Sequence, residues 1–163
     1  IGVEAPNAEE IAFAKGIYDS LTEGERRNYL GLMRSFGYVG DGSEFAGKYL
    51  SDSISPYVAS EEAMAGSTDV ADVSWVVPTA QLSTSTAALG TALHTWQMTS
   101  QGISSNAHKA MLRAAGAMAL AGVQAVQDAA VLEKIQAEFA RFQAANPYRN
   151  PIPADIRPST LNK

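Results

Sequence analysis

Apolar residues near the start of the chain recur with the period of an α-helix. Intervals of three or four residues separate Ile11, Ala14, Tyr18 and Leu21, so these side chains would lie along one side of a helix. Asn7 followed by Glu10 resembles a capping box, which is a local signal for a first helical turn. The pattern predicts a helix over residues 8–22.

After this helix the hydrophobic pattern changes. Glycines interrupt short apolar clusters over residues 22–52, which predicts a short helix followed by a long surface excursion. Residues 54–59 favour a short strand. Residues 75–86 also favour a strand, because an apolar run is followed there by alternating side chains. Pro78 places that second strand at an edge or interrupts it.

Two more helices are expected toward the end of the chain. Asn106 can cap a helix that reaches Gln127, and Asp128 can cap the next one. Both helices carry an apolar stripe, and we expect their methionine and aromatic positions to pack in a core. The stripes are Met111, Ala115, Met118, Gly122 and Val126, then Leu132, Ile135, Phe139 and Phe142. Prolines follow, so residues 146–163 are predicted to form an extended tail.

Composition narrows the class of protein. The 163 residues are enough for one domain, or part of one, and no apolar stretch is long enough to cross a membrane. A net charge of −5 offers no broad basic surface for a nucleic acid. The lack of cysteine excludes disulfides and thiolate chemistry and fits a reducing compartment. We therefore expect a cytoplasmic protein that binds neither nucleic acid nor membrane.

The chain contains two histidines, His94 and His108. A catalytic zinc typically takes three protein ligands and a water, so two imidazoles cannot complete such a site. Carboxylates or another segment would have to supply the remaining ligands. Judged from the residues alone, an ordinary hydrogen-bonded histidine is the commoner interpretation of each ring.

The segment Gly-Ser-Thr-Asp-Val-Ala-Asp-Val-Ser-Trp, residues 66–75, places two carboxylates three residues apart beside hydroxyl groups. A turn explains this composition, because such side chains bond to the nearby backbone. A triad of Ser67, Asp69 and His94 can be drawn, but nothing in their spacing requires it. The glycines of residues 37–42 lack the Lys-Ser/Thr ending of a phosphate loop.

Three motifs taken together carry more information than each one alone. They are the ten-residue segment followed by Val-Val-Pro-Thr, the Leu-His-Thr-Trp around His94, and the Ala-His-Lys around His108. In content, order and separation they resemble the B-type aminobenzoyl-glutamate utilization branch of the M20 peptidases. Asn-Pro-Ile-Pro in the tail is similar as well. Ala71 and Ala110 depart from the resemblance, because many relatives have glycine at these places.

This resemblance implies an α/β fold, helix-rich with a few strands. Residues 1–163 would be the C-terminal part of a three-layer α/β/α catalytic domain of the zinc-exopeptidase type, following an inserted lid domain. They would pack against the remainder of that domain, and the lid would form a homodimer. Apolar surface that normally meets the remainder should then be exposed in this chain.

The resemblance also implies a reaction. Relatives use two divalent metal ions, zinc or manganese, to hydrolyse the amide bond of an aminobenzoyl-glutamate-like or N-acyl amino acid substrate. Their general base and most metal ligands precede the lid. No catalytic residue is therefore expected in this chain, and alone it should be inactive. The competing hypothesis is an independent, non-catalytic binding module that folds completely without metal.

Site residues are implied motif by motif. His94 corresponds to the last metal ligand of the family, and Trp96 would pack near it. His108 could orient a partner or a substrate carboxylate, or it could serve only in capping or packing. Ser67, Thr68 and Asp69 would line or brace the site.

Overall fold

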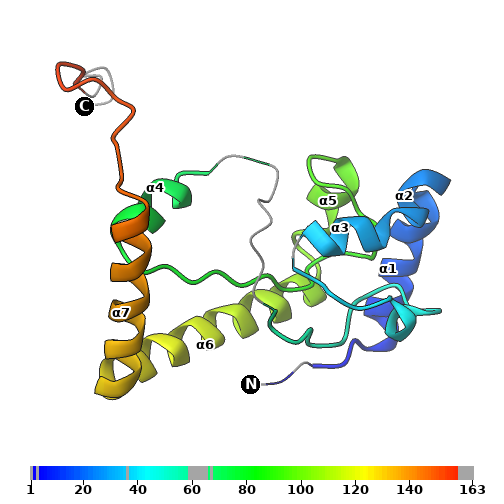
Figure 1. Cartoon of the computed structure of the whole chain (residues 1–163). Helices are drawn as coiled ribbons and strands as arrows, with labels where there is room; N and C mark the ends of the chain where they lie inside the picture. Colours follow the sequence, from blue (N-terminus) through cyan, green and yellow to red (C-terminus); the bar gives the residue numbers. More distant parts are fainter. Residues whose placement is uncertain (1, 3, 36, 59–65, 67, 158–163) are drawn as a thin grey trace. The chain divides into compact units, whose positions relative to one another are not determined.

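A computed structural model of the chain describes residues 2, 4–35, 37–58, 66 and 68–157. These residues form helices joined by irregular segments, and they contain no strand (Figure 1). They divide into two compact units. The first comprises Ile1–Gly66 and Gln81–Val123, and the second comprises Ser67–Ala80 and Gln124–Lys163.

Helix α1 (Ala8–Ser20) opens the first unit and confirms the helix predicted over residues 8–22. The expected capping box is present. Asn7 Oδ1 accepts a hydrogen bond from the Glu10 amide at 2.9 Å, and a Glu10 carboxylate oxygen accepts one from the Asn7 amide at 2.8 Å. Ala14 and Ile17 are buried on one side of the helix, where they pack with residues from later in the chain.

The glycine-rich stretch after α1 contributes to the core. It forms α2 (Glu23–Arg27), α3 (Tyr29–Ser35) and the 3₁₀ turn η1 (Ser43–Phe45). Tyr38 and Phe45 are buried against Leu89. The short-helix prediction holds, but the long surface excursion is wrong, because irregularly spaced aromatic residues bury themselves without producing a helical or strand period.

Two helices complete the first unit. Helix α5 (Trp96–Gln101) follows the segment that carries His94, and the long helix α6 (Ser105–Gln127) continues into the second unit. The predicted end of α6 is confirmed, but Asn106 is not its cap. Ser104 Oγ accepts the Ala107 amide at 3.1 Å, and the Asn106 side chain donates to the Ser85 carbonyl at 3.2 Å.

The second unit contains α4 (Val70–Val76) and α7 (Ala129–Ala145). Asp128 caps α7 as predicted, since its side chain accepts from two backbone amides of the first turn. Trp75 on α4 packs against Phe142 on α7, with ring centroids 5.2 Å apart. The Gln143 side chain of α7 donates to the Trp75 carbonyl at 3.2 Å. Residues 146–157 form no helix or strand.

Both predicted strands are wrong over the residues that can be examined. Residues 54–58 are irregular, while Ala59 lies outside the described residues. Trp75 and Val76 end α4, and residues 77–86 form neither helix nor strand. A strand needs a neighbour for its amide and carbonyl groups, and these two segments do not pair with one another. The α/β/α class therefore stays a prediction about the chain together with further segments.

Helix α6 leaves much of its apolar stripe exposed. Met111, Met118 and Val126 are 57%, 59% and 84% exposed, so the prediction that its methionines lie in the core is wrong within this chain. Phe142 on α7 is also exposed, at 44%. The exposure agrees with the expectation that apolar surface would be left uncovered. Among the described helices none alone is long and apolar enough to span a membrane, and only α6 and α7 counted as one bent pair reach that length and composition.

Candidate functional site

The residues singled out from the sequence fall into both units. His94, Trp96 and His108 belong to the first unit, and Thr68 and Asp69 belong to the second. Ser67 lies outside the described residues. The structure thus places His94 and Trp96 in one short segment, and it gives Thr68 and Asp69 a local setting of their own.

His94 is exposed and has an unusual backbone conformation. Its φ of 61° is the positive φ found among the described non-glycine residues, a region that such residues seldom occupy. Its ring has no hydrogen bond or ion pair within the described part of the chain, so both nitrogens face solvent. An imidazole in this state can donate an electron pair to a metal.

The segment on either side of His94 is held firmly. After it, Thr95 caps α5: its hydroxyl accepts the Met98 amide at 3.2 Å and donates to the Ala92 carbonyl at 2.8 Å. Before it, residues 88–91 form a buried turn in which the Thr91 amide donates to the Ala88 carbonyl at 3.1 Å. The chain leaves the buried turn, exposes His94, and returns into a helix.

Gly90 makes this buried turn possible. Its φ is +83°, and a Cβ added there would lie 3.2 Å from the Glu25 carbonyl oxygen and 3.3 Å from Leu21. A side chain would therefore be strained both in its backbone angles and in its contacts. The close approach of Gly90 to the end of α1 and to α2 fixes where the following residues emerge.

Trp96 is the first residue of α5 and is 63% exposed. Its ring has no aromatic partner among the described residues. It lies two positions from His94, so the two exposed rings belong to the same edge of the first unit. The expected packing of Trp96 beside a metal site stays a prediction.

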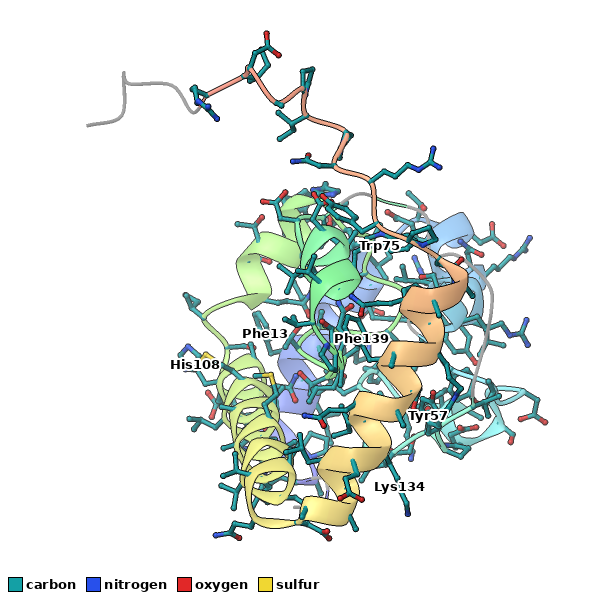
Figure 2. The ribbon with its side chains drawn as sticks, turned by 60° about the vertical axis from the view of Figure 1, so that its left-hand side comes forward. Phe13, Tyr57, Trp75, His108, Lys134 and Phe139 are labelled. Carbon is teal, nitrogen blue, oxygen red and sulfur yellow. The ribbon has the colours of Figure 1, made fainter. Side chains whose placement is uncertain are left out.

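His108 lies on the first turn of α6 and is exposed, with its side chain projecting outward from the helix (Figure 2). The first turn itself is fixed. Its amides meet Ser104, and Lys109, the next residue, forms ion pairs with Glu10 at 3.0 Å and Glu4 at 3.2 Å. His108 is thus a free side chain on an immobile backbone.

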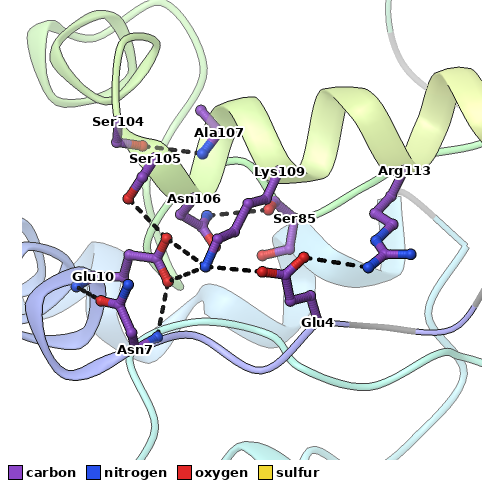
Figure 3. A network of polar contacts seen from close by, with 10 residues as sticks. All are labelled: Glu4, Asn7, Glu10, Ser85, Ser104, Ser105, Asn106, Ala107, Lys109 and Arg113. Atoms are coloured by element: carbon purple, nitrogen blue, oxygen red, sulfur yellow. Dashed lines mark hydrogen bonds and ion pairs between the residues drawn. The ribbon is translucent and has the colours of Figure 1, made fainter.

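Glu10 is the centre of the network that holds this turn (Figure 3). Although it is only 4% exposed, its carboxylate accepts hydrogen bonds from the Asn7 amide, from Ser105 Oγ at 2.7 Å and from Lys109 Nζ. The Asn7 amide bond lowers the pKa of Glu10; burial opposes this, and Ser105 and Lys109 add to the lowering. A carboxylate held in this way is an anchor and a poor proton acceptor.

Glu4 extends the network along α6. It pairs with Lys109 and with Arg113, whose Nη2 lies 3.2 Å from a Glu4 oxygen. These two partners lower the pKa of Glu4, Lys109 first, and the carboxylates of Glu10 and then Glu4 raise the pKa of Lys109. The sequence indicated Glu10 only as a capping residue, since no local pattern signals a contact between residues 99 positions apart.

Thr68 and Asp69 form the turn that leads into α4. The Thr68 hydroxyl accepts the Val70 amide at 3.3 Å, and the Thr68 carbonyl accepts the Ala71 amide at 3.1 Å. Asp69 is exposed and its side chain makes no cap bond. The turn interpretation of this segment therefore holds. Of its two carboxylates, Asp72 has a defined contact, because Tyr148 Oη donates to it at 3.1 Å.

A shallow hollow of about 330 Å³ lies beside that contact within the second unit. Its lining residues are Asp72, Trp75, Pro147, Tyr148, Arg149 and Pro151. Burial, and then the hydrogen bond to Asp72, raise the pKa of Tyr148. None of the residues singled out for the metal site lines this hollow.

The capacity of the chain to bind a metal is limited. The described residues contain no group of three or more His, Asp or Glu side chains placed to hold one ion. His94 fits the role of one ligand, because its ring is accessible and has no protein partner. It could take part in a site only with donors that lie elsewhere.

Comparison with known proteins supplies the context for this residue. No family model matches the chain, and no solved structure matches it. The chain is 42% identical over 159 residues to the B-type subunit of p-aminobenzoyl-glutamate hydrolase from Escherichia coli (strain K12). The match covers 95% of this chain and 33% of that relative, so the chain spans about a third of the relative's length. The resemblance found in the motifs is thereby confirmed, and the chain belongs to the family of B-type aminobenzoyl-glutamate hydrolase subunits.

Proposed function

We propose that this chain is part of an amidohydrolase, and that His94 is one of the ligands of its metal site. The substrate class is an aminobenzoyl-glutamate-like or N-acyl amino acid amide. The name of the relative, p-aminobenzoyl-glutamate hydrolase, supports the reaction class. The observation that carries the role of His94 is its accessible imidazole, held without any protein partner at a positive φ.

Within this proposal the chain acts by placing side chains. A divalent cation, zinc or manganese, supplies the polarisation of the attacking water and of the scissile carbonyl. His94 contributes one neutral nitrogen donor from a backbone fixed on both sides. His108 binds a substrate carboxylate from the rigid first turn of α6. The general base and the other ligands come from the rest of the protein.

The exposed stripe of α6 supports the proposed architecture. An M20-type α/β/α domain would cover Met111 and Met118, which are exposed in this chain, with parts of the domain outside residues 1–163. The proposal places this chain after a lid domain that forms a homodimer. The relative is named as one subunit of its enzyme, which also supports a partner subunit for the longer protein.

The test uses the full-length protein that contains this chain. Hydrolysis of p-aminobenzoyl-glutamate is followed by chromatography with zinc or manganese present, and bound metal is counted by elemental analysis. We expect His94→Ala to lose activity beyond the roughly 10- to 100-fold typical when a group that only supports a ligand is changed, and to bind less metal. Thr99→Ala, an exposed change on α5, is the control. A His94→Ala protein with normal metal content and activity would exclude His94 from the site.

A further inference from the structure

Gln101, the last residue of α5, is a buried amide with several defined partners. It is 3% exposed. Its Oε1 accepts the Ala88 amide at 2.6 Å, and its Nε2 donates to Thr91 Oγ1 at 3.2 Å and to the Gln97 carbonyl at 3.0 Å. Buried polar groups are costly unless they are hydrogen-bonded, and this amide satisfies both its acceptor and its donors.

These bonds connect two parts of the chain that flank His94. Ala88 and Thr91 are the ends of the buried turn before it, and Gln101 ends the helix after it. The Thr91 hydroxyl donates to the Ala88 carbonyl at 2.7 Å, which closes the turn on itself. The Leu89 amide donates to the Tyr49 carbonyl at 2.8 Å, which ties the turn to the rest of the first unit.

We infer that Gln101 is the positioning residue for His94: its side chain fixes the distance between the buried turn and α5, and so the place where the imidazole emerges. The inference rests on the proposed function of His94. The geometry has a simple consequence, because residues 92–95 can bridge only the gap that Gln101 defines. If the gap widens, the ring moves relative to ligands supplied by other segments.

A metal site responds sharply to such movement. Ligand groups must stay close to their preferred positions, and loss of a group that orients a ligand commonly weakens metal binding by about 10- to 100-fold. Gln101 touches neither the metal nor the substrate in this account. Its effect passes through the backbone of residues 88–95.

The experiment measures metal affinity in the full-length protein by competition with a chelator. Gln101→Met keeps the length of the side chain but removes its hydrogen bonds, and Thr91→Val removes the hydroxyl that Gln101 contacts. For both variants we expect zinc or manganese affinity to fall about tenfold or more, and kcat to fall while KM for p-aminobenzoyl-glutamate changes little. Ile17→Val, which weakens the same unit through its α1 core, is the matched control and should bind metal normally.

Two outcomes separate the inference from the function on which it rests. If His94→Ala binds metal normally, the proposed function fails, and the positioning role fails with it. If His94→Ala loses metal but Gln101→Met and Thr91→Val keep wild-type affinity, only the positioning role is overturned. A drop in thermal midpoint equal to that of Ile17→Val, with unchanged metal affinity, would likewise assign Gln101 to structure alone.

Discussion

At the scale of single residues, His94 occupies a backbone conformation that suits other residues better. A left-handed φ costs a residue with a Cβ roughly 1–2 kcal/mol, whereas glycine adopts it freely. The exposed ring offers no packing in return. Strain of this kind concentrates at functional sites, where a side chain is kept for its chemistry. His94 therefore fits the proposed metal ligand better than a structural role.

The substitution His94→Gly should separate chemistry from stability. Relief of the positive φ is partly offset by the greater freedom of glycine in the unfolded chain, so we expect the free energy of unfolding to stay unchanged or to rise by up to about 1 kcal/mol. Hydrolytic activity of the full-length protein should nevertheless be lost. Denaturant unfolding and the hydrolysis assay measure the two effects.

A second glycine substitution provides the comparison. Thr99→Gly lies within α5, where glycine costs about 1 kcal/mol and no catalytic role is proposed, so stability should fall and activity should remain. If His94→Gly destabilises the protein as much as Thr99→Gly does, the imidazole has structural contacts and the interpretation is wrong.

The sequence identified His94 through its motif but could not predict its conformation. Leu-His-Thr-Trp contains no residue that signals a positive φ. The conformation arises because the chain must turn between residues 88–91 and the cap of α5. Gln101, which spans that turn, lies in an ordinary polar stretch, and only its tertiary contacts reveal it.

At the scale of elements, local signals worked where the contact was local. The capping box of α1 and the Asp128 cap of α7 were predicted, because each joins residues two or three positions apart. Ser104 displaced Asn106 as the cap of α6 because the Asn106 side chain is drawn to Ser85. Strands failed because their hydrogen bonds need partners that local sequence does not specify.

The connection between α1 and α6 depends on one carboxylate. The pKa of Glu10 is lowered below its ordinary value of 4.5, first by the Asn7 amide. Its contribution to stability is therefore complete above the pKa of the unfolded carboxyl and is lost as pH falls through the lower folded pKa. Acid should loosen this contact only below about pH 4.5.

Glu10→Gln tests this connection in the 163-residue chain. We expect the free energy of unfolding at neutral pH to fall by about 1–3 kcal/mol, because Lys109 and two hydrogen-bond donors lose a charged acceptor. The difference from wild type should shrink as the pH is lowered below 4.5. Urea unfolding at several pH values measures both effects. Glu9→Gln, an exposed neighbour, should change little, and a deficit for Glu10→Gln that is independent of pH would contradict the assigned role of the charge.

At the scale of the whole molecule, the two compact units bury few large side chains. The buried residues of the first unit form two small clusters, around Ile17 and around Phe45. Much of the stripe on α6 remains exposed. Composition alone predicted an ordinary core, because it counts apolar residues without regard to what lies opposite them.

Met118→Lys tests what that exposure means. In the 163-residue chain we expect less binding of an apolar dye and less self-association, with stability changed by no more than about 0.5 kcal/mol, since the residue is 59% exposed. In the full-length protein the same change should lower the midpoint of unfolding, because the proposed domain covers this stripe. Ala119→Lys adds the same charge at a neighbouring exposed position. Equal behaviour of Met118→Lys in both lengths of protein would count against the α/β/α proposal.

The close approach at Gly90 has a consequence for how this protein can vary. Position 90 accepts hydrogen alone as its substituent, because anything larger meets the Glu25 carbonyl oxygen. Randomisation of that codon, followed by selection for aminobenzoyl-glutamate use in living cells, should return glycine almost exclusively. A residue that performs no chemistry would thus be as invariant as any ligand.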